Sequence, residues 1–336
     1  MTTLNNDESH TLTNAKTALR AYAEGIEADP QNNSVFAYAR DLFRSLEDGE
    51  QSTQDLSALI NEVFSRLITE RAERFAAQHA ETDALDSRLR HLAAQGWQVF
   101  KQAVETPNGG IVFTAHPTFA LSRETRQAFA DYATQPRDIS RAALEDEIAK
   151  DSRSWSQTIS LKGEHSEVQS AIAHAQSALK AYLQRIYALA ETAFPETWTG
   201  LRPAAPSLAS WVGYDLDGRT DIHWSQSFAL RLGEKAEQLA RYVAALDKLV
   251  AGGETESASA LLAIRNRLQE AQEVTSSDYA AFDTDLTQPN ALVQAANTLT
   301  TPDSRRLTHL TDQIAQLRAI AKTEGETAPA IARACL

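Results

Sequence analysis

Cysteine is nearly absent from this chain of 336 residues, which contains only Cys335. A single thiol rules out disulfide bonds within the chain and leaves too few thiolates for a cysteine-based zinc site. The sequence also lacks any apolar run close to the roughly 20 residues that a membrane-spanning helix needs. Residues 1–8 contain neither a basic nor an apolar stretch, so we expect no secretory signal and a cytoplasmic protein.

Several common catalytic and nucleotide-binding motifs are missing as well. The sequence has no Walker A loop, no Gly-x-Gly-x-x-Gly run and no Gly-x-Ser-x-Gly run. Its eight histidines are scattered, and no pair has the His-Glu-x-x-His spacing of a helical zinc site. The usual signatures of P-loop ATPases, dinucleotide-binding enzymes and serine hydrolases are therefore absent.

The charge balance is acidic, with a net charge of −13. Such a surface repels the phosphates of nucleic acids and of anionic lipids, so we expect neither nucleic acid nor a membrane as a partner. A small anionic substrate is still compatible, because a local group of Arg or Lys in a cleft can hold it. The length, with 43% hydrophobic and 23% charged residues, is typical of one large or two ordinary globular domains.

Most of the chain has the periodicity of helices. Ser52 and Asp55 form a capping-box pattern, and apolar residues follow at helical spacing from Leu56 to Ile68. Similar apolar stripes run from Leu85 to Val104 and from Val168 to Ala190. Further helices are expected over residues 14–28, 34–47, 122–133, 226–250, 256–273 and 304–322.

Two short stretches break the helical pattern. Residues 109–117 have a β-branched and aromatic centre with glycine before it and proline after it, which predicts a short buried strand. Residues 206–218 predict a second short strand that runs into an Asp/Gly turn. Both strands end in polar residues and are followed by helix, and such strand ends are where α/β proteins hold ligands.

His116 is the best candidate for a catalytic residue, because it follows the first of these strands. Thr114 and Thr118 flank it, and its imidazole could act as a general base or bind an anion. The alternative is a core histidine bonded to a backbone carbonyl, which is the commoner situation for an isolated histidine. Arg123 and Arg126 lie one helical turn apart just beyond it, and either bind a phosphate or form a solvated helix face.

Asp215 and Asp217 are the polar residues at the end of the second strand. Two residues apart on an extended chain, their carboxylates share one face. They could hold a metal, orient an arginine or fix the turn at Gly218. Two carboxylates are too few for Mg²⁺, so the turn is the favoured interpretation.

The two strand-end segments together resemble one known family. Residues 113–118 read Phe-Thr-Ala-His-Pro-Thr, and residues 210–218 read Ser-Trp-Val-Gly-Tyr-Asp-Leu-Asp-Gly. The phosphoenolpyruvate carboxylases carry Phe/Leu-Thr-Ala-His-Pro-Thr and, farther along, Ser-Trp-x-Gly-Gly-Asp-Arg-Asp-Gly-Asn-Pro. Because the first run matches throughout and the second follows after mostly helical sequence, the chain resembles the N-terminal part of that family.

The resemblance implies a mainly α fold with a few short parallel strands, as the N-terminal part of a helix-decorated (β/α)₈ barrel. Within one such portion, residues 1–336, it implies a helical region at 1–105, the first two strands with intervening helices at 106–225, and a helical region at 226–336. A barrel needs eight strands. We therefore expect apolar strand edges to be exposed, unless a helical shell or self-association covers them.

The resemblance also implies an activity, the conversion of phosphoenolpyruvate and bicarbonate to oxaloacetate and phosphate. His116 would be catalytic and would take the proton from carboxyphosphate, while Arg123, Asp215 and Asp217 would bind substrate or support the site. The family uses Mg²⁺ or Mn²⁺ as a Lewis acid, and its metal ligands belong to the C-terminal part of family members. We therefore expect a partner, either that C-terminal half or further copies of this chain, and no carboxylation by this chain alone.

Four positions depart from the family pattern. Phe119 stands in place of Glu or Gln, and Ser122 in place of the first residue of a basic pair whose second member is Arg123. Tyr214 and Leu216 replace a glycine and an arginine. Because these changes remove polarity or positive charge where an anion should bind, the alternative is a non-catalytic helical binding or regulatory module derived from the family.

Overall fold

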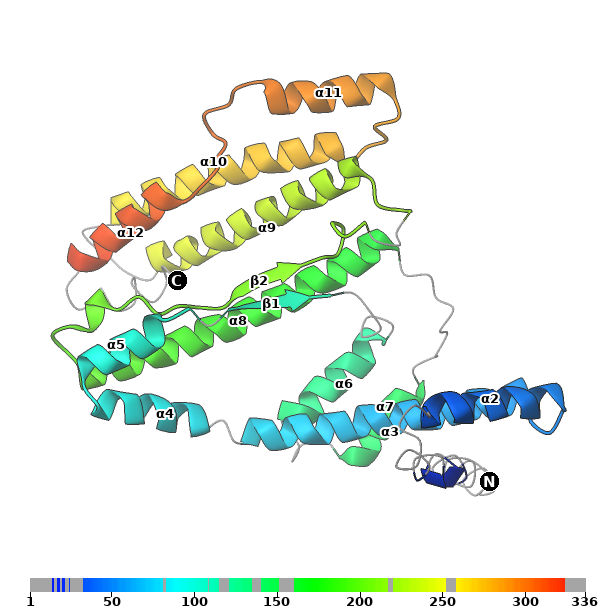
Figure 1. Ribbon diagram of the computed structural model, residues 1–336. Helices are drawn as coiled ribbons and strands as arrows, with labels where there is room; N and C mark the ends of the chain where they lie inside the picture. Colours follow the sequence, from blue (N-terminus) through cyan, green and yellow to red (C-terminus); the bar gives the residue numbers. More distant parts are fainter. Residues whose placement is uncertain are drawn as a thin grey trace. The chain divides into compact units, whose positions relative to one another are not determined.

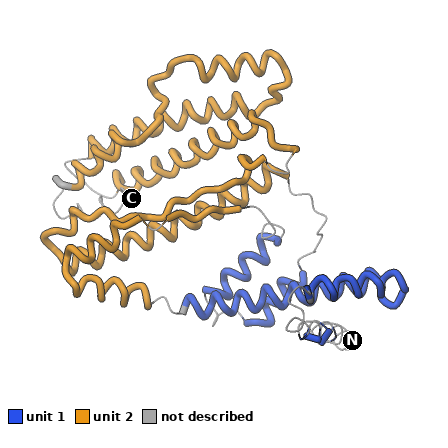
Figure 2. The backbone as a smooth tube through the Cα atoms, in the orientation of Figure 1, with its two compact units in different colours: residues 1–83, 120–157 blue, residues 84–119, 158–336 orange. Residues whose placement is uncertain are grey.

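The computed structural model describes residues 33–80, 83–107, 109–114, 121–134, 140–150, 160–216, 220–251 and 258–323, and single helical positions between 14 and 24. Over these residues the protein is mainly helical, with two short parallel strands, as the sequence predicts (Figure 1). None of the described helices combines the length and the apolar character that crossing a membrane requires. The chain forms two compact units, residues 1–83 with 120–157 and residues 84–119 with 158–336 (Figure 2).

Unit 1 has four helices with described bounds, namely α2 (Ser34–Glu47), α3 (Thr53–Ala80), α6 (Arg123–Thr134) and α7 (Arg141–Lys150). The predicted capping box of α3 is confirmed, because the backbone N–H of Ser52 donates to the Asp55 carboxylate at 2.8 Å and that of Asp55 donates to the Ser52 hydroxyl at 3.2 Å. Helices α3, α6 and α7 enclose an apolar core that includes the fully buried Leu144 and Ile148.

Unit 2 contains α4 (Asp83–Ala94), which begins at the unit boundary, α5 (Trp97–Glu105), β1 (Gly110–Phe113), α8 (Leu161–Ala193), a 3₁₀ turn (Trp198–Gly200), β2 (Ser207–Ser210), α9 (Trp224–Ala251), α10 (Ala258–Phe282), α11 (Pro289–Thr300) and α12 (Thr311–Thr323). One apolar core joins α4 and α5 to the C-terminal half of α8 around Phe100 and Ile186. A second joins α9, α10 and α12 around Leu261 and Leu268.

Several of the predicted helix boundaries need correction. The stripe at Leu85–Val104 is two helices rather than one, because Gly96 has φ +100 and interrupts the helical backbone. Residues 283–303, which lie between two of the helices expected from the sequence, contain α11. The helix expected from 304 begins only at Thr311.

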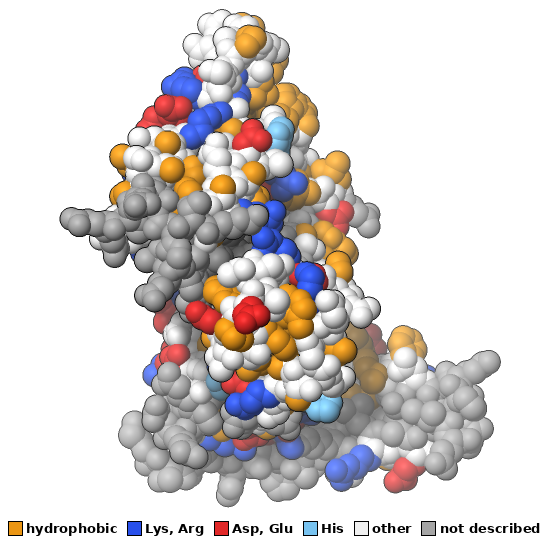
Figure 3. Space-filling model, turned by 90° about the vertical axis from the view of Figure 1, so that its left-hand side faces the viewer, with side chains coloured by type: hydrophobic (Ala, Val, Ile, Leu, Met, Phe, Trp, Pro, Cys, Tyr) orange, Lys and Arg blue, Asp and Glu red, His pale blue; other side chains and the backbone are white. Residues whose placement is uncertain are grey.

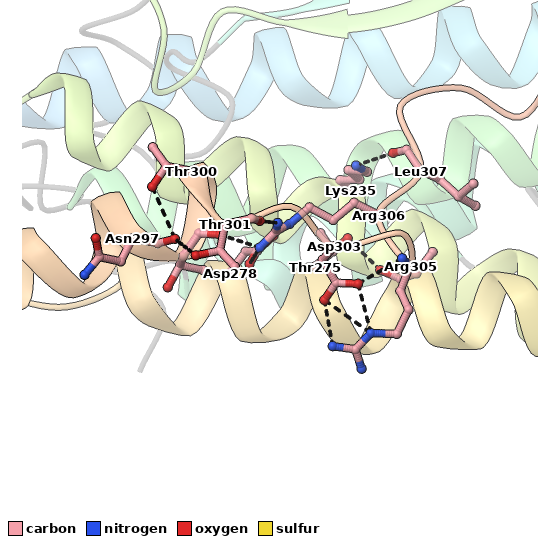
Figure 4. A network of polar contacts seen from close by, with 12 residues as sticks. Lys235, Thr275, Asp278, Asn297, Thr300, Thr301, Asp303, Arg305, Arg306 and Leu307 are labelled. Atoms are coloured by element: carbon pink, nitrogen blue, oxygen red, sulfur yellow. Dashed lines mark hydrogen bonds and ion pairs between the residues drawn. The ribbon is translucent and has the colours of Figure 1, made fainter.

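The late start of α12 has a visible cause in a network of polar contacts (Figure 4). Arg306 makes two hydrogen bonds of 2.8 Å to the carboxylate of Asp278 on α10, and a third, of 2.6 Å, to the carbonyl oxygen of Thr301. Asp278 is only 3% exposed. Because Arg306 is held by these partners, the chain between α11 and α12 is fixed against α10.

Strands β1 and β2 are both where the sequence places them, and they lie along α8 (Figure 1). They pair in parallel, from Gly110 opposite Ser207 to Phe113 opposite Ser210. The expectation that the first strand is buried was wrong, because Ile111 is 45% and Val112 is 47% exposed. Among the described residues β1 has one neighbouring strand only, so its remaining edge and much of its apolar surface stay open.

Candidate functional site

The two motif segments follow the carboxyl ends of the two neighbouring strands. Since Phe113 pairs with Ser210 in a parallel ladder, Thr114 and Trp211 continue from neighbouring strands in the same direction. His116, two residues beyond Thr114, lies outside the described residues. Its side-chain geometry therefore stays a prediction, whereas the start of its loop beside the second motif is described.

The turn after β2 is tied to the beginning of α9. Gly213 has φ +88, and a Cβ atom there would come within 2.3 Å of Leu230, so only glycine fits. The backbone N–H groups of Tyr214 and Asp215 both donate to the carbonyl oxygen of Trp211, at 2.9 and 3.0 Å. The hydroxyl of Ser227 on α9 donates to the carbonyl oxygen of Gly213 at 2.5 Å. This turn is consequently rigid on both its strand side and its helix side.

Asp215 ends this turn with its side chain exposed, and Leu216 beside it is 61% exposed. Asp217 lies outside the described residues, so the shared face expected for the two carboxylates stays a prediction. Arg123 is an exposed residue at the beginning of α6. It belongs to unit 1 whereas Asp215 belongs to unit 2, and the structure describes each within its own unit.

Two of the departures from the family pattern have structural roles. Ser122 caps α6, because its hydroxyl accepts a hydrogen bond of 3.1 Å from the backbone N–H of Thr125. Tyr214 packs below Arg231, whose guanidinium carbon lies 5.4 Å from the centre of the tyrosine ring. A lysine or arginine at 122 would lose the cap, and a glycine at 214 would lose the ring contact.

Behind Tyr214, a half-buried polar group joins α8 to α9. Glu234 lies 3.0 Å from the Nε2 atom of His165, and its carboxylate accepts hydrogen bonds from Gln169 at 3.1 Å and from Arg231 at 3.2 Å. Burial acts to raise the pKa of Glu234, but His165, Tyr214 and Arg231 outweigh it and lower the pKa. The glutamate is therefore held as a carboxylate.

The hydroxyl of Tyr214 is buried beside the carboxylate of Glu234. Burial, and then the nearby charge of Glu234, raise the pKa of Tyr214 far above its ordinary value. The phenol therefore stays protonated and keeps its hydrogen as a donor.

A cavity of about 330 Å³ lies beside this group, bounded by α8, β2 and α9. Three basic residues of α9 line it, namely Arg231, Lys235 and Arg241. None of them belongs to the two sequence motifs. The available signal was the polar spacing 231, 234, 235, 238 and 241 on one side of a helix whose other side is apolar.

The described residues contain no group of three or more His, Cys, Asp or Glu side chains arranged to hold a metal ion. Of the residues proposed from the sequence, Asp215 and Arg123 are described and His116 and Asp217 are not. No protein-family model matches the chain, and no curated protein matches it.

Proposed function

We propose that this chain is the histidine-bearing N-terminal part of a phosphoenolpyruvate carboxylase. The observation that carries the proposal is the pairing of β1 with β2. The strand that precedes Thr114-Ala115-His116 lies next to the strand that precedes Trp211 and Asp215, and both run in the same direction. The polar residues that follow them therefore start at the carboxyl ends of the strands, where parallel sheets commonly hold ligands.

In this proposal β1 and β2 are the first two strands of a (β/α)₈ barrel. Parallel strands are normally covered on both faces and paired on both edges. Ile111 and Val112 are instead close to half exposed, and β1 pairs only with β2 among the described residues. Further strands beside β1 would bury these side chains, which supports a larger barrel to which this chain contributes one part.

The proposed reaction begins when a bicarbonate oxygen attacks the phosphorus of phosphoenolpyruvate and the bond from phosphorus to the enol oxygen breaks. The products are carboxyphosphate and the enolate of pyruvate. His116 then accepts the proton of carboxyphosphate, which separates into CO₂ and phosphate. The enolate carbon attacks CO₂ to give oxaloacetate. Arg123, Asp215 and Asp217 would bind the anions or support the loops.

The family's Mg²⁺ or Mn²⁺ supplies Lewis-acid stabilisation of the enolate oxygen. The described residues of this chain do not fit such an ion, because they include no suitable cluster of ligands. In the proposal the metal ligands therefore come from the C-terminal part of the enzyme. The described residues act on the anions and on the loops of the site, and not on the metal.

The second candidate is a non-catalytic helical module derived from the same family. It is favoured by the structural use of Ser122 as a helix cap and of Tyr214 as a packing residue. Both occupy positions at which the family has a basic residue or a glycine. A chain released from catalysis would keep the strands as a scaffold and lose the groups that bind anions.

The test is an assay of oxaloacetate formation by the complex that the tagged chain forms in its own cells, with phosphoenolpyruvate, bicarbonate and Mg²⁺. We expect turnover by this complex, and a loss of at least about 100-fold in His116→Asn, since general acid–base catalysis contributes that much or more. His174→Asn, an exposed position on α8, is the matched control and should leave turnover unchanged. Full activity of His116→Asn would reject the assigned role, and an inactive wild-type complex would favour the non-catalytic module.

A further inference from the structure

Helices that pack together in a domain usually do so through apolar side chains. The contact between α8 and α9 is polar instead. Gln176 of α8 donates to the side-chain oxygen of Gln238 at 2.8 Å and accepts from Arg241 at 2.6 Å. Together with the hydrogen bond from Gln169 to Glu234, these contacts form what we call the polar seam. Burying such groups is costly unless they are satisfied, so the seam calls for an explanation other than stability.

Of the three basic residues that line the cavity, one has no carboxylate partner. Arg231 is paired with Glu234 at 3.2 Å, and Arg241 lies 3.8 Å from Glu237. Lys235 has no carboxylate within ion-pair distance among the described residues. Its ammonium group donates to the carbonyl oxygen of Leu307 (Figure 4), which uses one of its three hydrogens.

The surroundings of Lys235 do not supply the missing negative charge. Asp278, the carboxylate that acts on it electrostatically, is already bonded twice to Arg306. Burial lowers the pKa of Lys235, which is the sign of a cation without sufficient compensation. On the face seen in Figure 3, acidic and basic side chains are scattered among apolar ones.

The groups around the cavity that remain available are donors. They are the ammonium group of Lys235, with two hydrogens left after its bond to Leu307, and the side-chain nitrogen of Gln238, for which the described residues provide no hydrogen-bond partner. The carboxylates of Glu234 and Glu237 line the cavity as well, and each is paired with an arginine. Ser210 of β2 lines the same cavity. Donors combined with an uncompensated positive charge select an anion and disfavour a cation.

We infer that the cavity between α8, β2 and α9 is a binding site for a small oxyanion, a phosphate or carboxylate group, held by Lys235 with Gln238 and Arg241. The volume of about 330 Å³ is at the lower end of the range for small-molecule sites. Gln238 and Arg241 line the same cavity, about 4.5 and 9 Å beyond Lys235 along the axis of α9. The inference does not depend on the proposed carboxylase activity.

The experiment is an isothermal titration calorimetry measurement, in which the full chain is titrated with inorganic phosphate at constant ionic strength. Malonate in a second titration distinguishes a preference for phosphate from a general preference for oxyanions. We expect saturable binding to the wild-type chain and an affinity at least ten-fold weaker in Lys235→Met, which keeps the length of the side chain and removes its charge. Lys248→Met, an exposed lysine on the same helix, is the matched control and should bind like the wild type.

Arg241→Gln is the second variant, for the case in which Lys235→Met does not fold, and it should weaken binding as well. Equal affinity in the wild type and in the folded Lys235→Met or Arg241→Gln chain would overturn the inference, as would the absence of saturable binding of both probes. His116→Asn should bind phosphate as the wild type does. Phosphate binding can therefore be tested even if the chain has no carboxylase activity, and the two proposals can fail independently.

Discussion

Helix α9 packs in two different ways on its two sides. Towards α10 and α12 it places Leu239, Val243 and Leu246, each at most 6% exposed, in a continuous apolar core. Towards α8 and β2 it places the polar seam, in which side chains are joined by hydrogen bonds across the helices. The first side contributes stability by removing apolar surface from water. The second contributes little net stability per bond, but it fixes polar groups around a cavity.

The largest effect is expected for the ion pair on the side of α10. Arg306→Met would leave the carboxylate of Asp278, 3% exposed, without its cation, and should cost about 3–5 kcal/mol of unfolding free energy. Urea denaturation followed by circular dichroism measures this loss. Arg305→Met is the control, because Arg305 pairs with Asp303 at the surface, and its midpoint should hardly move. A loss as small in Arg306→Met would show that Asp278 does not need the pair.

The next effect compares the two sides of α9 directly. Leu268→Ala opens a cavity in the apolar core and should cost about 2–5 kcal/mol. Gln176→Leu removes two hydrogen bonds of the seam but adds an apolar group of similar size, and should cost about 1 kcal/mol or less. The same denaturation experiment applies to both. If Gln176→Leu proves as costly as Leu268→Ala, the seam is a structural core and not a site with room for a ligand.

The smallest effect is one of pH. The pKa of Glu234 is lower in the folded chain than its ordinary value of 4.5, so its ionised form stabilises the fold above that pH and the contribution disappears as the pH falls through the folded pKa. The stability difference between the wild type and Glu234→Gln should therefore be greatest at pH 7 and shrink below pH 4.5. Unfolding curves from pH 7 to pH 3 measure it.

Glu237→Gln provides the control for this pH series. The Glu237 side chain is 61% exposed and lies 3.8 Å from Arg241, so solvent screens most of its interaction. Its difference from the wild type should be small and nearly independent of pH. A Glu234→Gln difference that also stays flat would contradict the assignment of Glu234 as a stabilised carboxylate.

The sequence predicts the local features of this fold well. The cap at Ser52, the helix over residues 34–47 and both strands depend on neighbouring residues, and the structure has all of them. Helix α11 escaped prediction because it is uncharged and rich in Thr, Asn and Gln, which are also typical of loops. Local composition could not decide between these two structures.

The polar seam escaped prediction for another reason. Its partners, such as Gln169 with Glu234 or Gln176 with Gln238, are more than sixty residues apart in sequence. Periodicity shows which side of each helix is apolar, but not which polar sides face each other. Tyr214 offered a hint, because a tyrosine in place of a family glycine requires space and a partner, and Arg231 provides that partner.

The pairing of β1 with β2 also has a consequence for the order of folding. Helices α6, α7 and α8 all lie between the two strands in sequence, so the ladder closes a long loop and costs chain entropy before it brings any contact. Helices α9 and α10, which are consecutive, can pack before that loop is closed. The paired strands whose carboxyl ends lead into both motifs should therefore be among the last parts of unit 2 to assemble. The hairpin of α9 and α10, which follows them in the chain, should form earlier.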